Sequence, residues 1–155
     1  MGQFVMICLA ELTKRGYYGY RSLLFSGTGN SLHVAKELQK RDPETNIIAI
    51  VGLLDNAIIE TRGEIVGIVF PIHLAMAPAP VMEFLKKLDL KSADYIFALV
   101  TRAGSPHRAF IDLDKILKKK GKSLDSFFTL NMASNDPKFE DWPPGNIRRN
   151  CKFGI

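Results

Sequence analysis

The chain has 155 residues, of which 46% are hydrophobic and 24% are charged, and its formal net charge is +5. This length fits one domain, since domains commonly contain about 100–200 residues. Two cysteines, Cys8 and Cys151, are too few for a disulfide framework, a zinc site or an iron–sulfur cluster formed by this chain alone. No apolar run approaches the roughly 18 residues that span a bilayer, so we expect no membrane segment and a cytoplasmic location.

The positive charge is concentrated in Lys118, Lys119, Lys120 and Lys122. Cations at the end of a helix complement its dipole, and such a run is usually a solvated face. No basic stripe alternates with aromatic residues, so nucleic acid is not an expected partner.

Apolar runs and helical periods alternate from about residue 20 to residue 132. In chain order, the predicted elements are strand Ser22–Phe25, helix Ser31–Lys40, strand Asn46–Val51, strand Glu64–Phe70, helix Pro80–Leu90, strand Tyr95–Thr101, helix His107–Lys120 and strand Ser126–Met132. The segment Leu53–Arg62 is too short and too mixed to assign.

Strands that are apolar throughout and alternate with amphipathic helices indicate a parallel sheet covered on both faces. Right-handed connections then give a three-layer, doubly wound α/β domain, here over residues 20–135. A five-stranded sheet of this type normally ends with a helix. Residues 136–155 are Pro-rich and lack a helical apolar period, so we expect an irregular tail and no last helix.

The leader, residues 1–19, has two interpretations. Phe4, Ile7, Cys8 and Leu12 have helical spacing, so the leader could form an extra helix that packs where the terminal helix is missing. The alternative is a disordered leader.

The segment with the clearest chemistry is Phe25-Ser26-Gly27-Thr28-Gly29-Asn30-Ser31-Leu32. A strand is predicted to end at its start and a helix to begin near Ser31. Glycines allow backbone N–H groups to turn inward, and the helix N-terminus adds further donors, so the segment predicts an anion site. The segment contains no Lys or Arg, so neutral hydrogen-bond donors alone would hold the anion. The alternative is a Gly-rich turn in which Ser31 is the N-cap. The P-loop pattern does not fit, because the loop lacks its lysine. The dinucleotide-binding pattern does not fit either, because the loop lacks a third glycine at the required spacing.

These residues resemble the phosphate loop of flavodoxins, most closely the flavodoxin half of bacterial flavodoxin–ferredoxin fusion proteins. Val69-Phe70-Pro71 and the stretch Phe97–Ser105 extend the resemblance, which covers about residues 20–135. It implies FMN as the cofactor and five parallel strands in the order 2-1-3-4-5.

The resemblance also implies three groups of FMN contacts. The phosphate would be wrapped by Ser26, Gly27, Thr28, Gly29, Asn30, Ser31 and Leu32. One face of the isoalloxazine would lie against Pro71, Ile72, His73 and Leu74. The other side and the pyrimidine edge would meet Thr101, Arg102, Ala103 and Gly104.

The second loop departs from the family, since neither an aromatic cluster nor a glycine follows Pro71. We therefore expect weaker flavin affinity. His73 is either a partial substitute for the aromatic stacking or a solvent-facing histidine. Arg102 is either near the flavin edge or a solvated cation.

The first functional interpretation is an FMN-binding electron-transfer protein with no catalytic residue of its own. Its partners would be redox proteins, such as a ferredoxin-type protein or a flavin reductase, and it would be a monomer or a dimer. The second is an FMN-dependent NAD(P)H:quinone-type reductase, with room beside the ring at Ala75 and Ala77. The third is a flavin-free remnant of such a domain.

Overall fold

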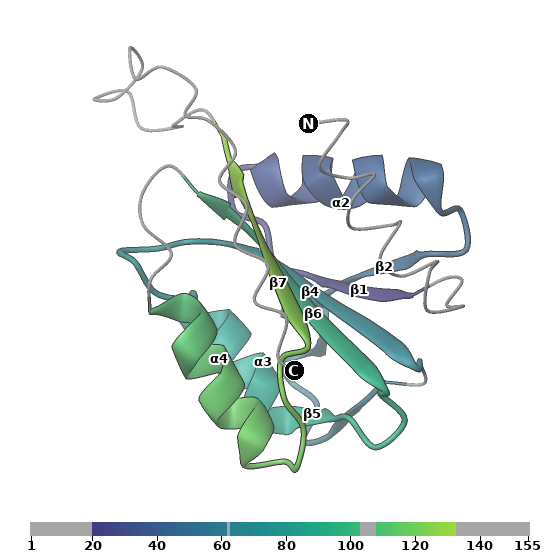
Figure 1. Cartoon of the computed structure of the whole chain (residues 1–155), viewed down its shortest axis with the longest axis vertical. Coiled ribbons are helices and arrows are strands. Elements are labelled where there is room, and N and C mark those ends of the chain that lie inside the picture. Colours follow the sequence, from purple (N-terminus) through teal and green to yellow (C-terminus); the bar gives the residue numbers. More distant parts are fainter. Residues whose placement is uncertain (1–19, 62, 103–107, 133–155) are drawn as a thin grey trace.

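The computed structural model describes residues 20–61, 63–102 and 108–132 (Figure 1). The predicted leader, the predicted tail, Ala103 and Gly104 lie outside these ranges. The domain predicted over residues 20–135 is thus described as far as Met132, and the stretch in which a last helix would follow the fifth strand lies beyond it.

Five strands form one parallel sheet at the centre of the domain (Figure 1). They are β1 (Arg21–Leu24), β2 (Asn46–Ala49), β4 (Ile65–Pro71), β6 (Tyr95–Arg102) and β7 (Ser126–Asn131). Their order across the sheet is β2-β1-β4-β6-β7, and every neighbouring pair is parallel. Numbered among themselves, these strands have the order 2-1-3-4-5, which confirms the predicted topology.

Helices cover both faces of the sheet, as predicted (Figure 1). One face carries α2 (Asn30–Arg41), and the other carries α3 (Ala79–Lys87) and α4 (Ala109–Lys118). Each helix buries residues at helical spacing, and each fully buried aliphatic or phenyl side chain contributes about 1.5–3 kcal/mol. These buried apolar side chains are Val34, Ala35 and Leu38 of α2, Val81, Phe84 and Leu85 of α3, and Ala109, Phe110, Leu113 and Leu117 of α4.

A row of aromatic rings crosses the face that carries α2. The Phe97 ring contacts the Tyr20 ring edge-on at a centroid distance of 5.2 Å and the Phe128 ring at 6.4 Å. The Phe97 ring lies against Gly67 of β4, where a Cβ atom would collide with it. The glycine in the middle of β4 therefore makes room for this ring, which packs the centre of the sheet.

The structure differs from the prediction where two apolar segments end early. The second strand ends at Ala49 rather than Val51, because Ile50–Leu53 turns into a short 3-10 helix, η1. The second helix ends at Lys87 rather than Leu90, because Leu88–Asp89 forms a strand, β5, parallel to β3 (Ile59–Glu60). This small second sheet contains part of the unassigned segment Leu53–Arg62.

The lysine run after α4 also differs from the prediction. Lys118 and Lys119 are exposed, but Lys120 and Lys122 are half-buried. Each of these two ammonium groups donates hydrogen bonds to backbone carbonyl oxygens of other segments. Half of the run is therefore tethered to the fold instead of forming a solvated face.

Among the described helices, none is both long and apolar enough to cross a membrane.

Candidate functional site

The predicted site residues come together because parallel strands end at a common edge. Leu24 of β1 lies opposite Val69 of β4, and the Phe25 N–H donates to the Val69 carbonyl at 2.9 Å. Pro71 of β4 lies opposite Thr101 of β6. The three predicted loops therefore leave the sheet at its carboxyl edge, where ligands of open α/β sheets usually bind.

The turn between β1 and α2 is shaped by Gly29. This residue has φ 95° and ψ −18°, a left-handed conformation that glycine adopts without steric cost, and it is the N-cap of α2. The alternative with Ser31 as N-cap is wrong, because the N-cap is Gly29 and Ser31 lies inside the first turn of the helix. The Ser26 hydroxyl reaches the first turn and accepts from the Leu32 N–H at 3.3 Å.

This turn has the features of an anion site. The backbone N–H groups of residues 27–29 and of Ser31 meet no acceptor among the described residues. The space over the turn is open, since a Cβ atom at Gly27 or Gly29 would have no neighbour within 4 Å. Unsatisfied N–H groups at a helix N-terminus, with the positive end of the helix dipole, favour a bound anion. The donors and the space therefore fit a phosphate group.

A buried hydrogen bond connects the start of α2 with the end of β6. The Ser31 and Thr101 hydroxyls lie 2.8 Å apart, although the residues are 70 positions apart in the chain. Ser31 is 1% exposed and Thr101 is 3% exposed. Because each hydroxyl already has a partner, their main contribution is to fix the first turn of α2 against the end of β6. Ser31 would then face an anion through its backbone N–H.

The second loop forms a tight reverse turn after Pro71. The Ile72 N–H donates to the Thr101 carbonyl at 2.9 Å, which holds the start of the loop against β6. The backbones of His73 and Met76 then exchange hydrogen bonds of 3.0 and 2.8 Å. Leu74 and Ala75, between them, have φ 46° and 66°.

Left-handed backbone at two residues with side chains costs roughly 1–2 kcal/mol each. Turns of this kind usually contain Asn or Gly, and this loop has neither. His73 is exposed, and Leu74 is 92% exposed at the tip. The loop therefore projects apolar surface beside the carboxyl edge, and its strain is held by the two backbone hydrogen bonds.

The third loop is described only at its start. Arg102, the last residue of β6, is half-buried, and its carbonyl accepts from the Met132 N–H at 2.9 Å. This burial disfavours a fully solvated cation at position 102. Ala103 and Gly104 lie outside the described residues, so their predicted contact with the pyrimidine edge stays a prediction.

Two features of this edge were not predicted. The Ser31–Thr101 bond has no local signal, because a contact between distant hydroxyls is set by the register of β1, β4 and β6. The role of Met76 in closing the second loop also has no signal, since the turn lacks the residues that normally mark one. For the Ser31–Thr101 bond, the available clue is that the predicted topology brings the start of the first helix close to the end of the strand that contains Thr101.

No protein-family model matches the chain, and no curated protein does. Solved structures do. One is named a "putative flavoprotein" from Bacteroides uniformis, with a TM-score of 0.55, 17% identity, and 81% of this chain and 95% of that chain covered. Another is an NADH:FMN oxidoreductase in its apo form, with a TM-score of 0.53, 14% identity, and coverage of 74% and 76%. A third is an NAD(P)H:quinone oxidoreductase from Methanothermobacter marburgensis, with a TM-score of 0.51, 9% identity, and coverage of 80% and 88%. At these identities the likeness establishes the fold, a three-layer flavodoxin-like α/β arrangement.

Proposed function

We propose that this chain is an FMN-binding redox protein and that the turn between β1 and α2 holds the phosphate of the cofactor. The observation that carries the proposal is the set of N–H groups around the left-handed Gly29 that have no acceptor among the described residues. Two solved structures of the same fold are named for flavin, one as an NADH:FMN oxidoreductase and one as a flavoprotein, which supports this choice of ligand.

Two of the other predicted contacts lie at the same edge. Pro71 ends β4 and Ile72 follows it, and the bond from the Ile72 N–H to the Thr101 carbonyl keeps them beside β6. FMN, when bound, would supply the electron-transfer chemistry. The protein would bind it, orient it through these loops and set its electrostatics through the half-buried Arg102.

The binding proposal is tested by titrating the purified full-length chain with FMN and following flavin fluorescence. Thr28 is exposed in the phosphate turn, so Thr28→Ala should preserve stability and weaken FMN binding by about tenfold, the loss of one hydrogen bond to a charged group. Ser123→Ala removes an exposed hydroxyl at the other edge of the sheet and should leave the affinity unchanged. Absence of FMN binding would refute the proposal and favour the flavin-free remnant.

The finer choice is between an electron carrier and a reductase. We propose a carrier that exchanges electrons with a partner protein, such as a ferredoxin-type protein or a flavin reductase, because the second loop projects the exposed apolar Leu74 beside this edge, where a partner protein would contact it. The reductase is the second candidate, since two solved structures of the same fold are named oxidoreductases of NADH or NAD(P)H.

Steady-state kinetics of the FMN-loaded chain separate the two. A carrier alone should not oxidise NADH or NADPH in the presence of a quinone, and it should pass electrons once a flavin reductase is added. Sustained oxidation by the chain alone would replace the carrier with the reductase.

A further inference from the structure

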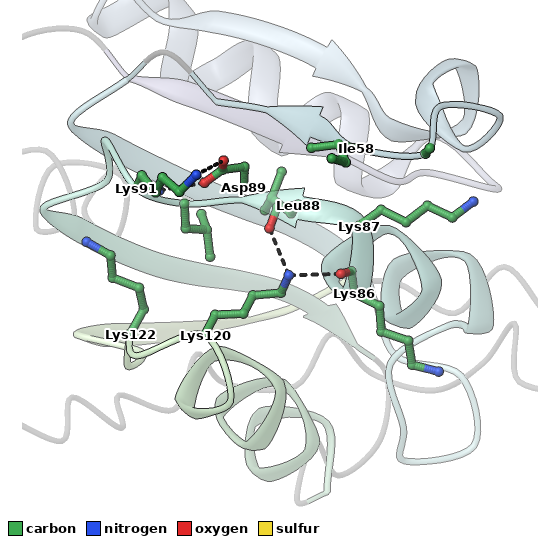
Figure 2. Close-up of a pocket in the computed structure, with 10 residues that line it drawn as sticks. Ile58, Lys86, Lys87, Leu88, Asp89, Lys91, Lys120 and Lys122 are labelled. Atoms are coloured by element: carbon green, nitrogen blue, oxygen red, sulfur yellow. Dashed lines mark hydrogen bonds and ion pairs between the residues drawn. The ribbon is translucent and has the colours of Figure 1, made fainter.

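A lysine-lined cleft lies at the opposite edge of the sheet, near the amino ends of β6 and β7. Its volume is about 380 Å³, and it is lined by the end of α3, by β5 and by the loop from α4 to β7 (Figure 2). Its charged lining residues are Lys86, Lys87, Asp89, Lys91, Lys120 and Lys122. Five lysines and one carboxylate therefore line the cleft, although Lys87 is paired with Glu83 at 3.0 Å.

Two of these cations are fixed in place by the fold. The Lys120 ammonium donates to the Lys86 carbonyl at 2.8 Å and to the Leu88 carbonyl at 2.9 Å, and the Lys122 ammonium donates to the Ala93 carbonyl at 2.6 Å. Neither ammonium has a carboxylate within 4.0 Å among the described residues. An ammonium has three donors, so both retain donors for a ligand. Their ordering in the free protein reduces the entropy that a ligand would have to offset.

The cations that face the cleft come from different segments. Figure 2 shows Lys120 and Lys122 along one side and Lys91 with Asp89 across from them, whereas Lys86 and Lys87 extend away. The Asp89 carboxylate is engaged by Lys91, with the backbone N–H at 3.0 Å and the ammonium at 3.3 Å. The hydrogen bond from the Lys91 N–H, with the charges of Lys91 and Lys120, lowers the pKa of Asp89 below its usual value. Asp89 thus offsets part of the charge of Lys91 and, more weakly, part of the charge of Lys120.

We propose that this cleft binds a small molecule through a diphosphate group. Its volume lies at the small end of the range for ligand pockets, about 300–1,000 Å³, and is too small for a helix or a nucleic acid. Ammonium groups on two sides match an anion with several charged oxygens. Ile58 lines the cleft and is 70% exposed, so an organic part of the ligand would find an apolar contact there. Pyrophosphate and a nucleoside diphosphate share the required group.

Isothermal titration of the full-length chain tests the proposal, with pyrophosphate, ADP and adenosine as probes and with and without FMN. Lys120→Gln combined with Lys122→Gln should raise the dissociation constant for pyrophosphate and ADP by at least about tenfold, because two charge-assisted contacts are lost. Lys36→Gln combined with Lys119→Gln is the matched control, since it removes the same charge from exposed positions outside the cleft and should change the constant less than about twofold.

A further variant guards against unfolding of the double variant. The Lys91 side chain is 92% exposed, and among the described residues it forms an ion pair with Asp89 alone, so Lys91→Gln should keep the fold and still weaken binding about threefold. Tighter binding of ADP than of pyrophosphate would identify a nucleotide, and equal binding would identify the diphosphate group alone as the ligand. No binding of either probe, or an equal loss in the control variant, would overturn the proposal and leave Lys120 and Lys122 as caps of backbone carbonyls.

Discussion

The hydrogen bond between Ser31 and Thr101 predicts a strong coupling between α2 and β6. Ser31→Ala removes one hydroxyl and leaves the Thr101 hydroxyl without its partner at a position that is 3% exposed. A buried polar group without a partner costs about 1–3 kcal/mol, so each single variant, Ser31→Ala or Thr101→Val, should lose that much free energy of unfolding. Removing both hydroxyls leaves no orphaned group. The double variant should therefore lose less than the sum of the two, with a coupling of about 1–2 kcal/mol.

Urea denaturation of the four proteins in this cycle measures the coupling. Ser22→Ala is a matched control, because the Ser22 hydroxyl is equally buried and has no hydrogen-bond partner among the described residues. That substitution should be neutral or stabilising, since it removes a buried polar atom without breaking a bond. Additive effects of the two single variants, or a loss in Ser31→Ala no larger than in Ser22→Ala, would refute a role for this bond in holding the loops together.

The remaining predictions concern Asp114 and the leader. Burial raises the pKa of Asp114. The ion pair with Lys118 at 2.7 Å and the hydrogen bond from the Leu124 N–H at 3.1 Å together lower this pKa by more than burial raises it, so it lies below its usual value. Its stabilisation is complete above the unfolded pKa, about 3.9, and is lost as the pH falls through the lower folded pKa. Asp114→Asn should cost about 1 kcal/mol at pH 7 and nothing near pH 2, as measured by urea unfolding. The exposed Asp55→Asn should show no such difference, and an equal pH dependence in both would contradict the assignment. Deletion of residues 1–19 separates the two interpretations of the leader. A helix packed on the sheet predicts a thermal midpoint that falls by several degrees, and a disordered leader predicts an unchanged midpoint.

The centre of the main sheet could be predicted because β4 and β6 are long and mostly apolar. The stretches around β4 and β6 read as buried parallel strands, and their alternation with amphipathic helices leaves few topologies. The small sheet of β3 and β5 could not be predicted, since two-residue strands have no periodicity. Leu88 continues the apolar pattern of α3, and only its pairing with Ile59 assigns it to a strand.

The candidate site could be predicted where one local segment carries it. The glycines and hydroxyls from Ser26 to Ser31 lie at one strand–helix junction, and the structure finds the expected donors there. The roles within the site could not be predicted, because they depend on contacts across the sheet. The sequence places Ser31 among the phosphate contacts, but only the structure shows that its hydroxyl is engaged with Thr101. The lysine run predicts a solvated face, which misses the hydrogen bonds of Lys120 and Lys122. The carbonyl groups that accept these bonds belong to distant segments, so the local sequence carries no sign of them.

The contact between Gly67 and Phe97 restricts how this domain can change over time. Any side chain at position 67 would displace a ring that is wedged between two others, and a smaller residue at position 97 would leave a void between Tyr20 and Phe128. Either substitution alone should therefore destabilise the domain. The centre of the sheet can vary only by a paired exchange, in which volume lost from one strand is regained on its neighbour.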